Sequence, residues 1–129
     1  MLSYQEYVKS VQQDIKEIDQ LAFYESLEQP RLVIDLREPE ELSNGKITGA
    51  VVIPRGMLEA KLMSLSPKDN AEDSEQWLQQ QDIVLYCASG ARSALSTKSL
   101  NEMGLTKVSS LVGGFNAWQK QGYPISDAS

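Results

Sequence analysis

The first pattern along the chain is an apolar stripe near its N-terminus. Tyr4, Val8, Val11 and Ile15 recur at i, i+4, i+7 and i+11. This spacing places them on one face of a helix of about four turns. We expect this helix to dock its apolar face on another surface.

Short, continuous apolar runs then replace the helical spacing. They are bounded by proline, glycine or polar residues, as buried strands of a parallel sheet are. These predicted strands lie at residues 32–36, 50–53, 83–86 and 108–112.

Helical signals alternate with the predicted strands. The first lies between Asp19, which is a suitable N-cap, and Pro30. The others begin after Pro39, run from Leu58 to Leu65, surround Trp77, cover residues 92–103 and follow Gly114. The polar residues 67–75 are expected to form a loop. Strands alternating with helices predict an α/β fold, with a mainly parallel central sheet flanked by helices on both faces.

The amino-acid composition excludes several kinds of catalytic and metal site. The chain has 129 residues, enough for one domain, with a single cysteine, Cys87, and no histidine. An intramolecular disulfide is therefore impossible, a Cys/His zinc site lacks ligands, and Ser-His or Cys-His catalysis lacks its imidazole. If Cys87 reacts, another group must activate it.

Charge and hydropathy narrow the partners. Twelve Lys and Arg against 18 Asp and Glu give a net charge of −6, without a basic run, so we expect no nucleic acid and no membrane as partner. No segment approaches the ~20 apolar residues of a membrane span, and the N-terminus lacks the pattern of a secretory signal. The expected location is cytoplasmic, where a lone thiol stays reduced.

The segment CASGARS, residues 87–93, follows the predicted strand 83–86. Ligands of open α/β sheets bind beyond the carboxyl ends of the strands. Small residues let this loop curl tightly, and Gly90 can adopt positive φ, so that successive amides point at one spot. A helix beginning around Arg92 adds its positive end. The sequence predicts an anion cradle around the Cys87 sulfur, built from Ala88, Ser89, Gly90, Ala91, Arg92 and Ser93.

Such a cradle favours the thiolate of Cys87 over the thiol without a histidine base. Arg92 offers a planar charged fork for a substrate oxyanion, which would enter against the overall negative charge. Arginine is opposed by the dipole in a first helical turn, which favours the anion-binding role. The alternative interpretations are a buried cysteine that fills space and a solvated arginine.

Four motifs, in order, resemble those of single-domain rhodaneses, a family of sulfurtransferases. They lie at residues 32–38, 45–50, 86–93 and 113–118, the last followed by Gly122. The resemblance implies a rhodanese-like fold with a helical extension at residues 1–15, a rhodanese domain at 16–125 and a tail at 126–129.

The resemblance implies a catalytic role for Cys87. Its sulfur would take a sulfane sulfur from a donor such as thiosulfate, become a persulfide, and pass the sulfur to cyanide or a thiol, without a metal or organic cofactor. The amides of residues 88–93 and the hydroxyl of Ser93 would hold the charged persulfide.

The resemblance also suggests roles for residues outside the loop. Arg55 is a second candidate for binding the donor, with a plain surface arginine as the alternative. Asp35 and Arg37 match the family's Asp-x-Arg motif, which implies an architectural role near the site.

The loop length distinguishes sulfur from phosphorus chemistry. Four residues separate Cys87 from Arg92, whereas related phosphatases and arsenate reductases of this fold carry five. Tyr86 also stands where such phosphatases often have histidine. Lys46 and Thr48 depart from the family's usual histidine and proline, and we expect altered turn stability rather than lost activity.

Two functions remain open at this stage. One is an enzyme that transfers sulfur between small molecules. The other is a carrier or sensor that exchanges persulfide sulfur with a protein donor or acceptor and has little small-molecule turnover. The N-terminal helix would then be a docking surface.

Overall fold

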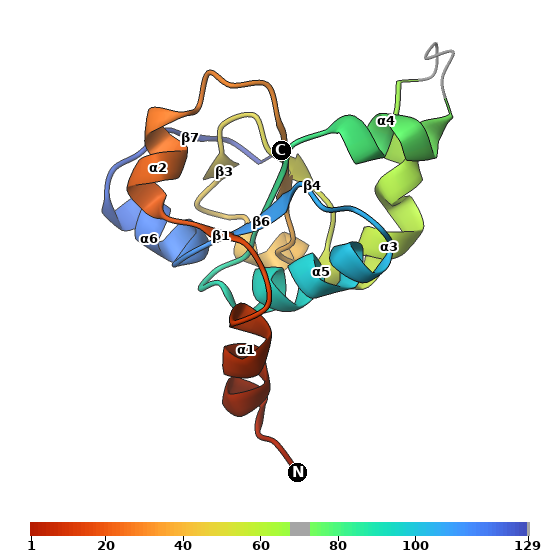
Figure 1. The fold of residues 1–129 in the computed structure, drawn as a ribbon. Helices are drawn as coiled ribbons and strands as arrows, with labels where there is room; N and C mark the ends of the chain where they lie inside the picture. Colours follow the sequence, from red (N-terminus) through yellow and green to blue (C-terminus); the bar gives the residue numbers. More distant parts are fainter. Residues whose placement is uncertain (68–72, 129) are drawn as a thin grey trace.

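The computed structural model describes residues 1–67 and 73–128. Its central sheet has five parallel strands in the order β1-β6-β5-β2-β4 (Figure 1). These strands are β1 Glu17–Ile18, β2 Leu32–Asp35, β4 Val51–Val52, β5 Ile83–Tyr86 and β6 Val108–Leu111. The mainly parallel α/β architecture predicted from the sequence is confirmed.

Helices cover both faces of the sheet. The α-helices are α1 Tyr4–Gln12, α2 Gln20–Glu25, α3 Leu58–Lys61, α4 Ser74–Gln80, α5 Ala91–Glu102 and α6 Gly114–Lys120, and the 3₁₀ helices are η1 Pro39–Glu41, η2 Arg55–Met57 and η3 Leu62–Leu65. In Figure 1, α2 and α6 lie on one side of the sheet, whereas α3, α4 and α5 lie on the other.

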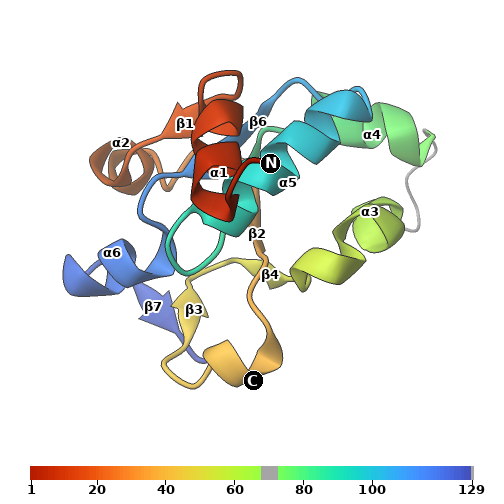
Figure 2. The ribbon, with the colours of Figure 1, turned by 90° about the horizontal axis from the view of Figure 1, so that it is seen from below.

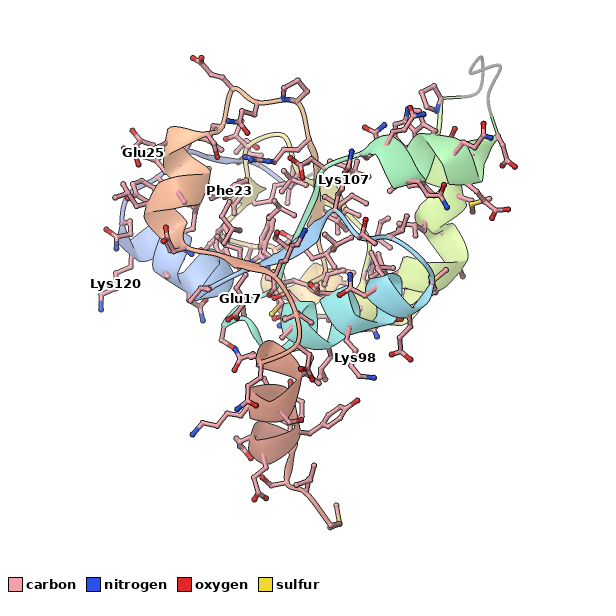
Figure 3. All side chains as sticks on the ribbon, viewed as in Figure 1. Glu17, Phe23, Glu25, Lys98, Lys107 and Lys120 are labelled. Carbon is pink, nitrogen blue, oxygen red and sulfur yellow. The ribbon has the colours of Figure 1, made fainter. Side chains whose placement is uncertain are left out.

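The two faces carry separate apolar clusters. Phe23 of α2 is fully buried, and its ring centroid lies 5.3 Å from that of Trp118 of α6. Figure 3 shows Phe23 toward the body of the protein, while Lys120 at the end of α6 points away from it. On the opposite face, Leu58 of α3 and Leu100 of α5 pack over the sheet.

Strand β5 sets the direction of the cysteine. All four residues of β5 are buried. Because side chains alternate along a strand, Leu85 and Cys87 join the cluster under α5, while Val84 and Tyr86 join the cluster under α6. The strand therefore directs the cysteine toward α5.

Helix α1 is shorter than predicted. Ser3 caps it, and Ser3 and Glu6 form a reciprocal capping box. Val8 and Val11 are buried, but the helix ends at Gln12 and leaves Ile15 outside. The chain turns there because β1, which the sequence did not predict, must pair with β6.

Other boundaries also differ from the prediction. The helix after Pro39 is one turn of 3₁₀ helix, and helix α4 begins at Ser74, inside the expected loop, of which residues 68–72 lie outside the described part. A small antiparallel sheet of β3 Lys46–Ile47 and β7 Ile125–Ser126 was not predicted. In residues 1–67 and 73–128, no helix is long and apolar enough to cross a membrane.

Candidate active site

The loop after β5 curls around the sulfur of Cys87. Gly90 adopts φ +112°, the left-handed conformation expected from the sequence, and α5 starts at the next residue. The Gly90 amide donates a hydrogen bond of 3.2 Å to Cys87 Sγ. The loop thus directs a backbone donor at the sulfur.

Helix α6 fixes the shape of this loop from the other side. The amide of Phe115 donates to the carbonyl oxygen of Cys87 at 2.8 Å, and the amide of Asn116 donates to that of Ala88 at 3.0 Å. At Gly114, a Cβ atom would overlap both carbonyl oxygens. Glycine is therefore required where α6 approaches the loop.

The sulfur lies at the base of the loop. Cys87 is 1% exposed, while Ser89 at the rim is exposed and Ala88 and Ala91 are partly exposed. A reacting molecule must therefore enter past the loop to reach the thiol.

Two buried hydroxyl groups lie on the inner side of the sulfur. Ser93 Oγ lies 3.7 Å from Cys87 Sγ and donates to the carbonyl oxygen of Gly90 at 3.2 Å. Ser110 of β6 is 2.7 Å from Ser93, Oγ to Oγ, and both serines are fully buried. Ser93 is a residue that the sequence predicts at this site, whereas Ser110 is not.

Arg92 is engaged by a carboxylate. Its Nη1 and Nη2 each lie 2.7 Å from an oxygen of Glu41, which forms a two-pronged ion pair. The hydrogen bond with Glu41 is the largest cause that raises the pKa of Arg92, and Cys87 adds to it. The hydrogen bond from Arg92 in turn lowers the pKa of Glu41 to about 2. The fork expected to face a substrate is thus occupied by Glu41.

Arg55, the first residue of η2, is linked to the middle of α5 through Glu59. Its Nη1 is 3.0 Å from both carboxylate oxygens of Glu59, and Ser99 of α5 donates to Glu59 at 2.5 Å. Burial alone would raise the pKa of Glu59, but the hydrogen bond from Ser99 and the charge of Arg55 lower it. Ser99 is about two turns along α5 from Arg92, so the structure ties Arg55 to the middle of that helix rather than to the loop.

Asp35 and Arg37 form a buried network with Tyr86. Asp35 accepts from Arg37 Nη2 at 2.8 Å and from the Tyr86 hydroxyl at 2.5 Å. Burial opposes the charge of Arg37, yet its bonds to Asp35 outweigh this and raise its pKa, while burial raises the pKa of Tyr86. Arg37 also donates to the backbone carbonyls of Glu41 and Gly45. The network therefore joins β2, β5 and the segment that carries Glu41.

Lys46, at the position where the resemblance implies a histidine, lies within a closed turn. Its Nζ donates to the backbone carbonyl of Ala50 at 2.6 Å, and its strand β3 pairs with β7. The Lys46 side chain thereby closes the turn between β3 and β4 with a hydrogen bond.

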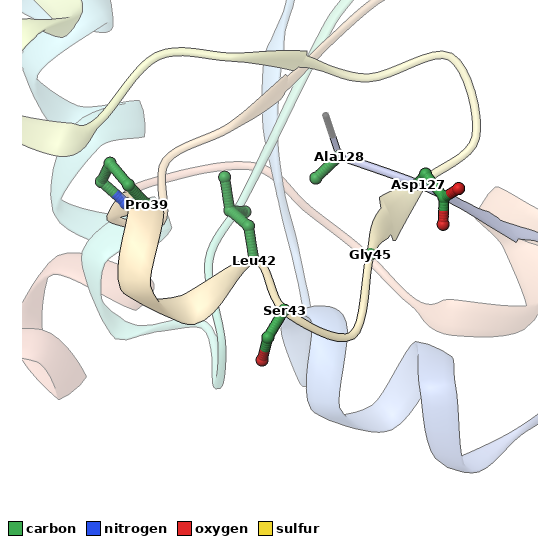
Figure 4. A pocket seen from close by; sticks show the side chains of 6 residues that line it. All are labelled: Pro39, Leu42, Ser43, Gly45, Asp127 and Ala128. Atoms are coloured by element: carbon green, nitrogen blue, oxygen red, sulfur yellow. The ribbon is translucent and has the colours of Figure 1, made fainter.

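Neither metal ligands nor the nearby surface hollow suggest another centre. In the described residues, no group of three or more His, Cys, Asp and Glu side chains could hold a metal ion. A hollow of about 410 Å³ lies beside η1 (Figure 4). Its lining consists of Pro39, Leu42, Ser43, Gly45, Asp127 and Ala128. None of these residues is a sulfur or hydroxyl nucleophile except Ser43, so the loop of Cys87 remains the candidate site.

The comparisons with known proteins agree with this fold. Residues 19–121 match the family model described as "Rhodanese-like domain". Over 91 residues, the chain is 38% identical to "Thiosulfate sulfurtransferase 16, chloroplastic" of Arabidopsis thaliana, covering 70% of this chain and 76% of that protein. The chain therefore belongs to the rhodanese-like domain family.

Two solved structures match almost the whole chain, including α1. A protein of Rhodopseudomonas palustris, described as of unknown function and "Possible Tyrosine Phosphatase", has a TM-score of 0.80 at 28% identity, covering 98% of this chain and 96% of that one. The polysulfide-sulfur transferase homodimer of Wolinella succinogenes has a TM-score of 0.76 at 28% identity, covering 98% and 88%. The fold and the relatives support sulfur transfer as the general activity.

Proposed function

We propose that the protein transfers sulfane sulfur through a persulfide on Cys87. The observation that best supports this proposal is the hydrogen bond of 3.2 Å from the Gly90 amide to Cys87 Sγ. The loop that provides this amide is held by hydrogen bonds from α6 to the carbonyl oxygens of Cys87 and Ala88. Such preorganised donors stabilise negative charge without reorganising during the reaction. A reducing cytoplasm suits this chemistry, because the lone thiol stays free there.

Each half of the reaction is a displacement at sulfur. The Cys87 thiolate attacks the sulfane sulfur of a donor such as thiosulfate, the S–S bond to the sulfonate group breaks, and sulfite leaves with the bonding electrons. Cyanide or a thiolate then attacks the outer sulfur of the persulfide. Thiocyanate or a new persulfide leaves, and the Cys87 thiolate is restored.

The test is thiocyanate formation from thiosulfate and cyanide. We expect turnover by the wild type, a mass increase of one sulfur atom after thiosulfate alone, and neither in the folded Cys87→Ser variant. Thiocyanate formation that persists in Cys87→Ser would refute the persulfide mechanism.

A protein-to-protein persulfide carrier is the second candidate. Figures 1 and 2 place α1 beside α5 and the loop that joins β5 to α5. Leu2, Tyr4 and Tyr7 are exposed at this helix, although Val8 and Val11 anchor it. An anchored helix with exposed apolar side chains next to the site is suited to docking a partner.

The docking role is tested by Tyr4→Ala combined with Tyr7→Ala. If partners dock on α1, this variant transfers sulfur to thiols of an added protein acceptor more slowly, while its turnover with cyanide is unchanged. Leu27→Ala, an exposed apolar side chain away from α1, is the control. Equal transfer by all three proteins would count against docking on α1.

Phosphatase activity is disfavoured as a third candidate. The interval of four residues between Cys87 and Arg92 is shorter than in the related phosphatases, and Tyr86 is occupied by its bonds to Asp35 and Ile47. We expect no phosphate release from p-nitrophenyl phosphate under conditions in which thiosulfate is turned over.

A further inference from the structure

The arginines around the site share one property: each is paired with a carboxylate. The pairs are Arg92 with Glu41, Arg55 with Glu59, and Arg37 with Asp35. The cradle was expected to be a positive pocket, but its nearest arginine is charge-compensated. The donor charge that the site prefers therefore depends on the carboxylate of Glu41.

The ion pair with Glu41 occupies the edge of the Arg92 guanidinium that carries Nη1 and Nη2. Two parallel hydrogen bonds of 2.7 Å join the two side chains, which are 32% and 31% exposed. This bidentate geometry is the one that a sulfonate or carboxylate of a donor would otherwise adopt. A donor anion must therefore compete with Glu41 or bind mainly to backbone amides.

Glu41 is held in this position by hydrogen bonds from Glu38 and Arg37. The amide of Glu38 donates to Glu41 Oε2 at 2.8 Å, and Nη1 of the buried Arg37 donates to the Glu41 carbonyl at 2.9 Å. Because Arg37 is only 2% exposed and bound to Asp35, the segment cannot turn away without breaking the buried network. The carboxylate is thus a fixed part of the site.

A fixed carboxylate affects donors according to their charge. Arg92 stands in the first turn of α5, two residues after Gly90, whose amide binds the Cys87 sulfur, so its charge acts close to the place where a donor must bind. Glu41 cancels much of that field. Since Coulomb energy scales with the ligand charge, a dianion loses twice the attraction that a monoanion loses. The amide dipoles of the loop remain available to both.

We infer that Glu41 is a specificity-determining residue that selects sulfane donors with a single negative charge over dianions such as thiosulfate. This inference rests on the proposed sulfur transfer and goes beyond it, because it names the charge class of the donor. Alkyl thiosulfonates and organic persulfides belong to the favoured class.

The test compares two donors that present the same sulfane sulfur with different charge. Thiosulfate carries two charges and methanethiosulfonate one; with the second, the Cys87 thiolate takes the sulfane sulfur and methanesulfinate leaves with the bonding electrons. In Glu41→Gln, which keeps an oxygen for the Glu38 amide, we expect kcat/KM to rise about fivefold for thiosulfate and about twofold for methanethiosulfonate. The effect should shrink at high salt.

The matched control is Glu40→Gln, which removes the same charge from an exposed neighbouring position. We expect both donors to keep their wild-type kcat/KM there. If Glu41→Gln leaves the ratio of the two kcat/KM values unchanged, or if Glu40→Gln shifts it equally, the inference is wrong while sulfur transfer stands.

A binding measurement separates this inference from the proposed function. Inorganic sulfate and nitrate, a dianion and a monoanion that donate no sulfur, are titrated as protectants of Cys87 against iodoacetamide. We expect Glu41→Gln to be protected by about fivefold less sulfate than the wild type and by about twofold less nitrate. Absence of turnover with both donors would refute the proposed function alone, and equal sulfate protection of the two proteins would refute the role of Glu41 alone.

Discussion

The hydroxyl groups of Ser110 and Ser93 lie 2.7 Å apart, and the second of them is 3.7 Å from the sulfur of Cys87. A serine hydroxyl has one proton to donate. When Ser110 donates to Ser93, the proton of Ser93 is free to turn from the Gly90 carbonyl to an anionic sulfur. We therefore expect Ser110 to act as a positioning residue through Ser93.

Ser110→Ala should slow the reaction of Cys87 without unfolding the protein. Loss of one buried hydrogen bond of about 1 kcal/mol corresponds to about a fivefold lower rate of persulfide formation. The loss should appear in kcat rather than in the KM for the donor, because Ser110 acts on the sulfur through Ser93 and not on the donor. Ser109→Ala, on the same strand but partly exposed, should leave both constants unchanged. An unaltered kcat in Ser110→Ala would contradict the relay.

Gly114→Ala should damage both stability and turnover. Its Cβ would lie 2.7 Å from the Ala88 carbonyl oxygen and overlap that of Cys87, at φ +56°. We expect the free energy of unfolding, measured in urea, to fall by about 2–3 kcal/mol and turnover to fall at least about tenfold. Gly122→Ala separates the two causes, because φ is +75° there but no atom lies within 4 Å of the added Cβ. Equal losses in the two variants would show that strain alone is responsible.

The ion pair of Glu41 should make stability depend on acid pH. Its pKa lies at about 2 in the folded protein, below the ordinary 4.5. The pair therefore contributes fully above about pH 5, and its contribution is lost as pH falls toward 2. For a partly exposed pair we expect about 1 kcal/mol. The free energy of unfolding of Glu41→Gln should fall less steeply over this range than that of the wild type or Glu40→Gln; parallel curves would oppose this.

Tyr86→Phe should weaken the fold more than the chemistry. It removes a buried hydroxyl that donates to Asp35 and accepts from the Ile47 amide at 2.9 Å. The amide is left unsatisfied, so the free energy of unfolding should drop by about 2–3 kcal/mol. Thiocyanate formation at 25 °C should stay within about twofold. Lost turnover in a variant of wild-type stability would instead place Tyr86 in the reaction.

Strands with a local signal were predictable, and those without one were not. β5 is a run of four buried apolar residues, and its predicted bounds, residues 83–86, match the observed strand. β1, β3 and β7 have two residues each and exist only because partners distant in the sequence offer hydrogen bonds. So short a segment carries no periodicity, and its pairing is decided by tertiary structure.

The candidate site divides in the same way. The loop from Cys87 to Arg92 is local, so its small residues and Gly90 could be interpreted directly. Glu41 reaches Arg92 across 51 positions, and Ser110 reaches Ser93 across 17. Both were therefore missed. The amides of α6 that hold the loop belong to the backbone and leave no residue-type signal at all.

The bonds from α6 divide the loop into a fixed stem and a free arc. The stem, Cys87 and Ala88, is fastened through its carbonyls, and the far end is fastened where Ala94 donates to the Gly90 carbonyl. An inserted residue is therefore tolerated only around Ser89, the exposed tip. Divergence of this scaffold toward larger oxyanions can proceed by lengthening that arc alone, while β5, α5 and the nucleophile keep their places.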